Sequence, residues 1–273
     1  MTIRYETLEL EYDNDWLTIW LNRPDSRNAL SAQMVGELQN VLGRIAADRA
    51  VRGVTLRGRG GVFCAGGDVK AFKAELQGER SDRDAVVRSS REGGLLFERI
   101  NTLPQAVVIL VEGAAIAGGL GMVCCADVVI VASDAEFALT ETTLGIPPAQ
   151  IAPFVAERLG LRTARRLMLT AARFTGAEAL ALGLADFVGS DLQQIETLEL
   201  GIRGQVRRCA PGANAATKEI LLASRHLDRA SMLDFAALTF ARCMLSDEGR
   251  EGVASFVEKR KPVWMQSSKG TAV

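Results

Sequence analysis

Histidine is nearly absent from this sequence, because His226 is the single one among 273 residues. Zinc sites that need several imidazole ligands are therefore excluded, and a Ser–His–Asp triad would have to use this residue. His226 lies in the polar stretch ASRHLDRA, between two expected helices. We interpret it as a surface or capping residue without a catalytic part.

Aromatic residues and an excess of charge of one sign are also lacking. Only 5% of the residues are aromatic, and 32 Lys and Arg nearly balance 33 Asp and Glu, which gives a formal net charge of −1. Proteins that bind nucleic acid present a basic surface, and those that bind single strands add aromatic platforms for the bases. We therefore expect no nucleic-acid partner.

Cysteine pairs and long apolar runs are missing as well. The cysteines are odd in number and form no CxxC pair, which favours reduced thiols and a cytoplasmic location: Cys64, Cys124, Cys125, Cys209 and Cys243. Residues 1–16 lack the basic and apolar regions of a signal peptide. The most apolar region, 106–132, is interrupted by Glu112 and Asp127, so it is too short to cross a membrane. We expect a soluble protein with no membrane partner.

The residues that are present predict an α/β core followed by helices. Hydrophobic residues make up 48% of the chain, enough for a large core. Strands and helices alternate up to about residue 190, which is typical of a layered α/β core, and only helical patterns follow. We therefore divide the chain into 1–190 and 191–273. Strands are expected at 7–12, 16–21, 51–56, 106–111 and 128–132, and a helix capped by Ser31 follows the second.

Two glycine-rich segments each follow a buried strand. They are Cys64-Ala-Gly-Gly-Asp68 and Ala117-Gly-Gly-Leu-Gly121. Ligands of open α/β sheets bind beyond the carboxyl ends of the strands, and a helix beginning at Gly118 would direct unpaired N–H groups there. Two such N–H groups would stabilise a developing oxyanion by ~3–4 kcal/mol each. From spacing alone, tight turns and helix packing explain the glycines equally well.

Six segments in order give the chain a resemblance that covers nearly its whole length. Their sequence is similar to that of the enoyl-CoA hydratase/isomerase (crotonase) superfamily. The segments are LNRPDSRNALS (21–31), GVFCAGGDVK (61–70), EGAAIAGGLGMVCCAD (112–127), FALTETTLGIPP (137–148), FTGAEALALGLADFV (174–188) and FVEKRKPVW (256–264).

The resemblance implies an α/β fold of repeated ββα units with a C-terminal helical trimerisation region, assembled as a trimer or a dimer of trimers. It implies an acyl-CoA thioester substrate and no metal or other cofactor. The backbone N–H groups of Gly67 and Gly118 would hold the thioester carbonyl. Further residues expected to contact coenzyme A or the acyl group are Arg27, Ala29, Ala65, Asp68, Ala149, Gln150 and Lys259.

The acid–base residues depart from the pattern of the hydratases in this family, which hold two glutamates. The second is present as Glu141, whereas the position of the first falls on Gly121. One carboxylate can move both protons of a hydration if the Ala149 N–H or the Gln150 amide holds the water. Burial beside apolar side chains should raise the pKa of Glu141, and the expected neighbours are Ile116, Leu144 and Ile146.

Three functions remain open. A hydratase of 2-enoyl-CoA thioesters is the leading hypothesis, with Glu141 as acid and base. A 3,2-enoyl-CoA isomerase needs one base only, so a lone glutamate fits it equally well. A non-catalytic acyl-CoA-binding scaffold is the third. The stretch ALTETTLGIPPAQIAPFVAERLG (138–160) is similar to hydratases of branched glutaconyl-type thioesters in terpene and leucine degradation, particularly the isohexenylglutaconyl-CoA hydratases.

Overall fold

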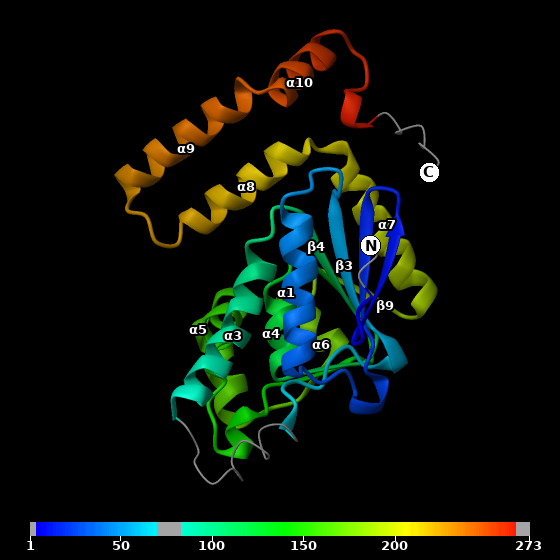
Figure 1. Ribbon diagram of the computed structural model, residues 1–273, viewed down its shortest axis with the longest axis vertical. Helices are drawn as coiled ribbons and strands as arrows, with labels where there is room; N and C mark the ends of the chain where they lie inside the picture. Colours follow the sequence, from blue (N-terminus) through cyan, green and yellow to red (C-terminus); the bar gives the residue numbers. More distant parts are fainter. Residues whose placement is uncertain (1–3, 70–82, 266–273) are drawn as a thin grey trace.

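A computed structural model describes residues 4–69 and 83–265, and a mainly parallel sheet lies at its centre (Figure 1). The strand order is β1-β2-β3-β4-β6-β9, in which only β1 and β2 are antiparallel. The strands are β1 (Leu8–Asp13), β2 (Trp16–Leu21), β3 (Gly53–Gly58), β4 (Ala106–Val111), β6 (Val128–Ala132) and β9 (Phe187–Gly189).

A small second sheet leads from the core towards the glycine-rich segments. It contains β5 (Ala114–Ile116), β7 (Glu136–Ala138) and β8 (Phe174–Thr175), in the order β5-β7-β8. Strands β5 and β7 are parallel, with Ile116 opposite Ala138. Because β5 continues from β4 and leads into a helix, this sheet sets the position of residues 117 and 118.

Helices cover both faces of the main sheet. In Figure 1, α1, α3 and α4 lie to one side, and α7 lies on the other, where it contacts β4, β6 and β9. The bounds are α1 (Ala32–Ala46), α3 (Arg83–Asn101), α4 (Gly118–Cys124), α5 (Ala152–Thr170), α6 (Gly176–Ala181) and α7 (Leu192–Arg208). Short 3₁₀ turns are η1 (Pro24–Ser26), η2 (Arg59–Gly61), η3 (Glu141–Leu144) and η4 (Val263–Met265). Among the described helices, none combines the length and apolar character that a membrane crossing requires.

The sequence patterns explain most of these elements. Strands 16–21, 106–111 and 128–132 match the prediction, because a strand covered on both faces is a continuous apolar run. Strands β1 and β3 begin one and two residues later than expected. Ser31 caps α1 as predicted, since its side chain accepts the N–H of Met34 at 3.2 Å. The charged region 69–100 was expected to be helical; α3 begins at Arg83, and 70–82 lie outside the described residues.

The last helices form an arm, α8 (Pro211–Ala223), α9 (Arg229–Met244) and α10 (Asp247–Val257), which projects from the core at the top of Figure 1. Ser246 caps α10, and Asp191 caps α7, because its carboxylate accepts the N–H of Gln194. His226 lies between α8 and α9 as predicted. Helix α7 packs on the sheet, so the projecting arm begins at α8.

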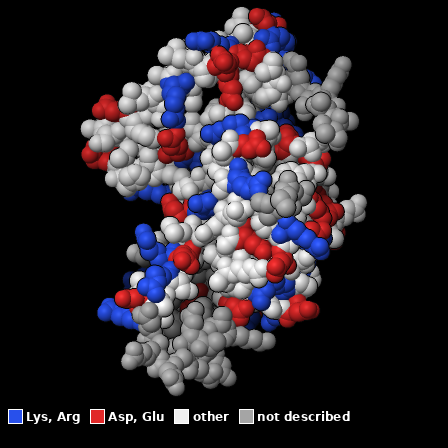
Figure 2. All heavy atoms as spheres, viewed as in Figure 1, with Lys and Arg blue, Asp and Glu red and all other residues white. Residues whose placement is uncertain are grey.

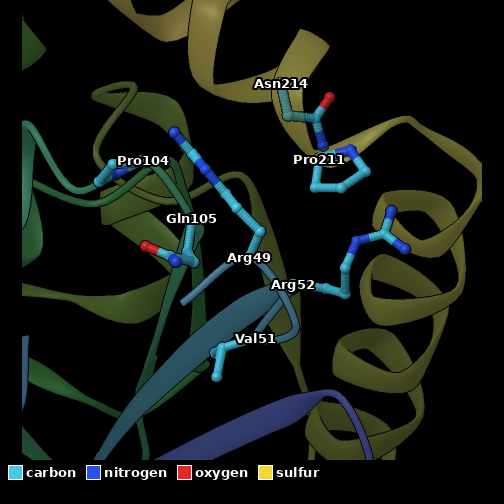
Figure 3. A pocket seen from close by; sticks show the side chains of 7 residues that line it. All are labelled: Arg49, Val51, Arg52, Pro104, Gln105, Pro211 and Asn214. Carbon is cyan, nitrogen blue, oxygen red and sulfur yellow. The ribbon is translucent and has the colours of Figure 1, made fainter. Parts of the chain in front are cut away.

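The junction between arm and core lies at the amino ends of β3 and β4. Arg52 donates hydrogen bonds there to the carbonyls of Val206, Cys209 and Trp264. A cavity of about 10 Å³, about the space of one water, lies beside it (Figure 3) and is lined by Arg49, Val51, Arg52, Pro104, Gln105, Pro211 and Asn214. A larger hollow of about 650 Å³ separates the end of α3 from the arm.

Charged side chains of both signs are interspersed on the face shown in Figure 2. This agrees with the formal net charge of −1.

Candidate active site

The structure brings the two glycine-rich segments together. Cys64 forms a parallel bridge with Ala115, through bonds from the Cys64 N–H to the Ala114 carbonyl and from the Ile116 N–H to the Cys64 carbonyl. Gly66 has φ of 92°, and a Cβ there would lie 2.8 Å from the Cβ of Ala117. Glycine is therefore required at residue 66 for the loops to approach this closely.

Each loop contributes a backbone N–H that is free to bind a ligand. The Leu30 N–H donates to the Gly66 carbonyl and the Asp68 N–H donates to the Leu30 carbonyl, so the N–H of Gly67 points to the other side of this extended pair. Gly118 is the first residue of α4, where N–H groups have no partner within the helix. Within the described residues, neither N–H has a recorded acceptor.

Ala117 holds the second loop in a strained conformation. Its φ of 51° and ψ of −120° belong to a region that side chains with a Cβ avoid. The bond from its N–H to the Ala138 carbonyl, 2.8 Å long, fixes this conformation. The same bond links the loop of Gly118 to the strand that precedes Glu141.

Glu141 begins η3, directly after this linked strand. Its Oε2 is buried and has no hydrogen-bond partner among the described residues. Burial raises the pKa of this carboxyl, and a hydrogen bond from its own backbone N–H opposes the shift only in part. The predicted direction is therefore correct. Of the expected neighbours, Ile146 donates its N–H to the Glu141 carbonyl at 3.3 Å, and the side chains of Leu144 and Ile146 are 56% and 43% exposed.

Gly121 lies on the first turns of α4, with no space for a side chain. A Cβ at this residue would lie 2.3 Å from Cγ2 of Ile151 and 3.3 Å from Cε1 of Phe97. Neither Phe97 nor Ile151 was predicted from the sequence as a site residue. The paired glycines Gly93-Gly94 in the middle of α3 are the signal that could have drawn attention to this helix.

The groups expected to hold a water are engaged elsewhere. The Ala149 N–H donates to the Pro147 carbonyl at 2.8 Å, so a tight turn occupies the donor in this structure and its role towards a water stays a prediction. The Gln150 amide nitrogen donates to Oγ of Ser90 at 3.1 Å. Gly94 leaves the space for it, since a Cβ there would lie 2.3 Å from Oε1 of Gln150.

Four of the residues expected to contact coenzyme A lie together at the loop of Gly67; they are Arg27, Ala29, Ala65 and Asp68. The Ala65 N–H donates to the Arg27 carbonyl at 3.0 Å, and Arg27 is exposed. Asp68 accepts hydrogen bonds from Arg23, which also donates to the Ala29 carbonyl at 2.7 Å. Asp68 therefore ties the loops to each other.

Lys259 lies at the end of the arm and Cys64 lies buried beside the glycine loops. Lys259 is exposed just beyond α10, whose main contacts are with α9, so a single chain does not bring it to the glycine loops. Cys64 is fully buried, and burial raises the pKa of its thiol to about 12. A thiol of this kind stays protonated at neutral pH and is no nucleophile.

Comparisons with known proteins agree with this geometry. The family described as Enoyl-CoA hydratase/isomerase matches residues 11–267. The human enoyl-CoA hydratase domain-containing protein 2, mitochondrial, is 31% identical over 89% of this chain and 83% of its own length. The short-chain-enoyl-CoA hydratase of Clostridium acetobutylicum is 29% identical over 92% of this chain and 95% of its own.

Solved structures share the fold over most of the chain. Pseudomonas aeruginosa AtuE is 51% identical with a TM-score of 0.92, covering 96% of this chain and 100% of its own. An enoyl-CoA hydratase/isomerase from Marinobacter aquaeolei is 41% identical with a TM-score of 0.91 over the same shares. The expected α/β fold with a helical C-terminal region is confirmed. This chain belongs to the enoyl-CoA hydratase/isomerase family.

Proposed function

We propose that this protein hydrates an α,β-unsaturated acyl-CoA thioester, with Glu141 as the catalytic acid and base. The observation that carries the proposal is the half-buried carboxyl of Glu141, whose Oε2 is buried and unpartnered among the described residues, on a segment bonded to the Gly118 loop. The N–H groups of Gly67 and Gly118 would bind the thioester oxygen, where negative charge develops. The reaction itself requires neither a metal nor another cofactor.

The proposed step balances through one carboxyl group. Water forms a C–O bond at the β-carbon and gives a proton to one oxygen of Glu141, while the π bond breaks and Cα takes a proton from the carboxyl. The N–H groups of Gly67 and Gly118 stabilise the negative charge that develops on the thioester oxygen as the enolate forms. Glu141 ends in the protonation state in which it began, and a raised pKa favours this exchange.

A 3,2-enoyl-CoA isomerase is the second candidate, and a specific observation favours it. Gly121 carries no carboxyl, and the Ala149 N–H and the Gln150 amide nitrogen already have partners. Isomerisation needs no bound water, since Glu141 removes a proton from one carbon of the acyl chain and returns it to another. The names of the relatives favour hydration.

The acyl group that we propose is a branched glutaconyl type, on the similarity of residues 138–160 to hydratases of such thioesters. The experiment uses 2-enoyl- and 3-enoyl-CoA thioesters, with branched glutaconyl types included, in heavy-oxygen water with mass detection. A labelled product one water heavier supports hydration. A product of unchanged mass with a moved double bond supports isomerisation, and binding without turnover supports the scaffold.

Replacement of the carboxyl tests both enzymatic candidates. Glu141→Gln should lower kcat by about 10²–10⁴-fold, the usual contribution of general acid–base catalysis, while substrate binding persists. The matched control is Glu136→Gln, because Glu136 is exposed and its carboxylate pairs only with exposed Arg173 among the recorded contacts. A rate unchanged by Glu141→Gln contradicts both candidates.

We further propose self-association through the arm, as a trimer or a dimer of trimers in the cytoplasm. Large apolar side chains on the arm are widely exposed, among them Leu238 at 72%, Phe240 at 67% and Phe256 at 85%, and such surfaces mark protein interfaces. Lys259 of a neighbouring subunit would then meet the coenzyme A phosphates. Light scattering tests the assembly, and Lys259→Ala should raise KM with kcat little changed.

A further inference from the structure

The surroundings of Gly121 exclude any side chain at this residue. A Cβ there would lie 2.3 Å from Cγ2 and 2.8 Å from Cβ of Ile151. Isoleucine branches at Cβ, so it cannot swing these atoms aside as a flexible side-chain end would. Ile151 and Phe97 are 3% and 5% exposed, and the interior around them leaves little room for adjustment.

Phe97 extends this apolar wall towards the carbonyl-binding loop. Its Cε1 would lie 3.3 Å from a Cβ at Gly121, and its Cζ would lie 3.8 Å from a Cβ at Gly118. One ring therefore borders both the N–H that would hold the thioester oxygen and the position one turn further along α4. Behind it, the ring of Phe154 lies 6.4 Å away between centroids.

The wall is built from two helices that do not carry Glu141. Phe97 belongs to α3, and Ile151 immediately precedes α5. Glu141 lies on η3, so the carboxyl and the wall reach the Gly118 loop from different elements. Gly121 carries no carboxyl, and Ile151 and Phe97 in addition occupy the volume in which a side chain at this residue would lie.

We propose that Phe97 and Ile151 are specificity-determining residues, which confine proton transfer to Glu141 by occupying the volume that a second carboxylate would need. The inference rests on the proposed function of Glu141. It means that the enzyme disfavours substrates whose hydration needs separate groups for water activation and for protonation of Cα. Crotonyl-CoA, a simple straight-chain thioester, is the substrate with which the test measures this effect.

The test restores the carboxylate with and without the space for it. The variants are Gly121→Glu, Ile151→Gly and the double variant Gly121→Glu/Ile151→Gly, because alanine at residue 151 would keep the Cβ that lies 2.8 Å away. We expect kcat/KM for crotonyl-CoA to rise about tenfold or more in the double variant over Ile151→Gly, as an added acid–base group should provide. Gly121→Glu alone should show no gain and should unfold at a lower temperature than the double variant.

The pH profile separates this role from a merely structural one. A second titrating carboxylate in the double variant should add an ionisation to the profile of kcat/KM that is absent in Ile151→Gly. The matched control is the pair Gly189 and Ile195, where a Cβ at the glycine would lie 2.6 Å from Cγ1 of the isoleucine. Ile195→Ala should destabilise the protein without changing the shape of its pH profile.

Each result of these experiments tests either the inference about Ile151 or the proposed function of the protein. If Gly121→Glu alone is as stable and as active as the double variant, Ile151 does not limit the space and the inference is overturned. If the double variant folds and binds crotonyl-CoA without a gain, the inference is overturned while wild-type activity keeps the proposed function intact. Wild-type protein inactive on every enoyl thioester contradicts the proposed function instead. Gly121→Asp/Ile151→Gly, with a shorter acid, replaces the double variant if that does not fold.

Discussion

Arg23 and Asp68 form an ion pair 3.3 Å long that joins the segment after β2 to the loop of Gly67. Arg23 also donates to the Ala29 carbonyl, so the pair fixes both loops that border the proposed coenzyme A site. Its side chains are 25% and 18% exposed, and an interaction of this kind contributes about 1 kcal/mol.

We therefore expect Asp68→Asn to lower kcat/KM by about fivefold, since 1 kcal/mol of lost positioning corresponds to that factor. Steady-state kinetics with an active thioester provide the measurement. The control is Arg173→Gln, which removes an ion pair of the same 3.3 Å length between more exposed side chains. Equal losses in both variants would show that the effect is general and unrelated to the Gly67 loop.

The raised pKa of Glu141 makes stability depend on pH. The folded protein holds the proton of Glu141 more tightly than the unfolded chain does. The favourable contribution of this proton to the free energy of unfolding is therefore fully present below the unfolded pKa of about 4.3. The contribution is lost as the pH rises through the folded value. We expect Glu141→Gln to unfold at a higher temperature than wild type at pH 7, and the difference to shrink towards pH 4.

Thermal unfolding followed at a series of pH values measures this effect. Glu136→Gln replaces an exposed carboxylate on the preceding strand and should show a smaller dependence. A difference between Glu141→Gln and wild type that stays constant from pH 4 to pH 7 would contradict the proposed burial of the ionised carboxylate.

Relief of the strain at Ala117 should stabilise the protein. Glycine adopts φ of 51° and ψ of −120° without the cost of about 1–3 kcal/mol that alanine bears, and it loses about 0.5–1 kcal/mol of chain entropy. Ala117→Gly should therefore gain about 1 kcal/mol, or about 2–4 °C in Tm. Ala171→Gly is the control, because φ of 50° and ψ of 31° lie in the milder left-handed region; an equal gain there would contradict the argument.

A buried ion pair within α7 is hydrogen-bonded to the main sheet. Arg203 and Glu199 are 2.7 Å apart with side chains 9% and 5% exposed, and Arg203 also donates to Oγ1 of Thr18. Glu199→Ala should cost about 3 kcal/mol, because it removes the buried partner of Arg203 and leaves only the more exposed Asp13, 3.4 Å away, as its ionic partner. Denaturant unfolding measures the loss, and the double variant Glu199→Leu/Arg203→Met should recover much of it; no recovery would show that packing, and not the unpaired charge, sets the cost.

Short sequence patterns correctly predicted the strands and the helix cap that depend only on neighbouring residues. Buried strands such as Ala106–Val111 were correctly delimited by their apolar runs, and Ser31 by its capping position. Strand β3 began later than predicted, because pairing of Gly53 with Trp16 sets its start. A Cβ at Gly53 would meet the Trp16 ring at 2.3 Å, a contact between residues that no short window contains.

The candidate site could be proposed from the sequence where a residue type carries the chemistry. Gly67, Gly118 and Glu141 came from the glycine loops and the family resemblance; the structure brings their loops together, and their roles stay predictions. The turn that occupies the Ala149 N–H was not foreseen, since it is a property of backbone geometry. Ile151 and Phe97 went unnoticed because their importance lies in the space that they take from a glycine on another helix.

Arg52 gathers both ends of the arm at one point, since its guanidinium holds Val206 and Cys209 before the arm and Trp264 after it. The chain between these anchors thus leaves the core and returns to the same place, as an inserted domain does. Helices α8 to α10 can therefore diverge in length and sequence, while the strands that precede Glu141 keep their connections.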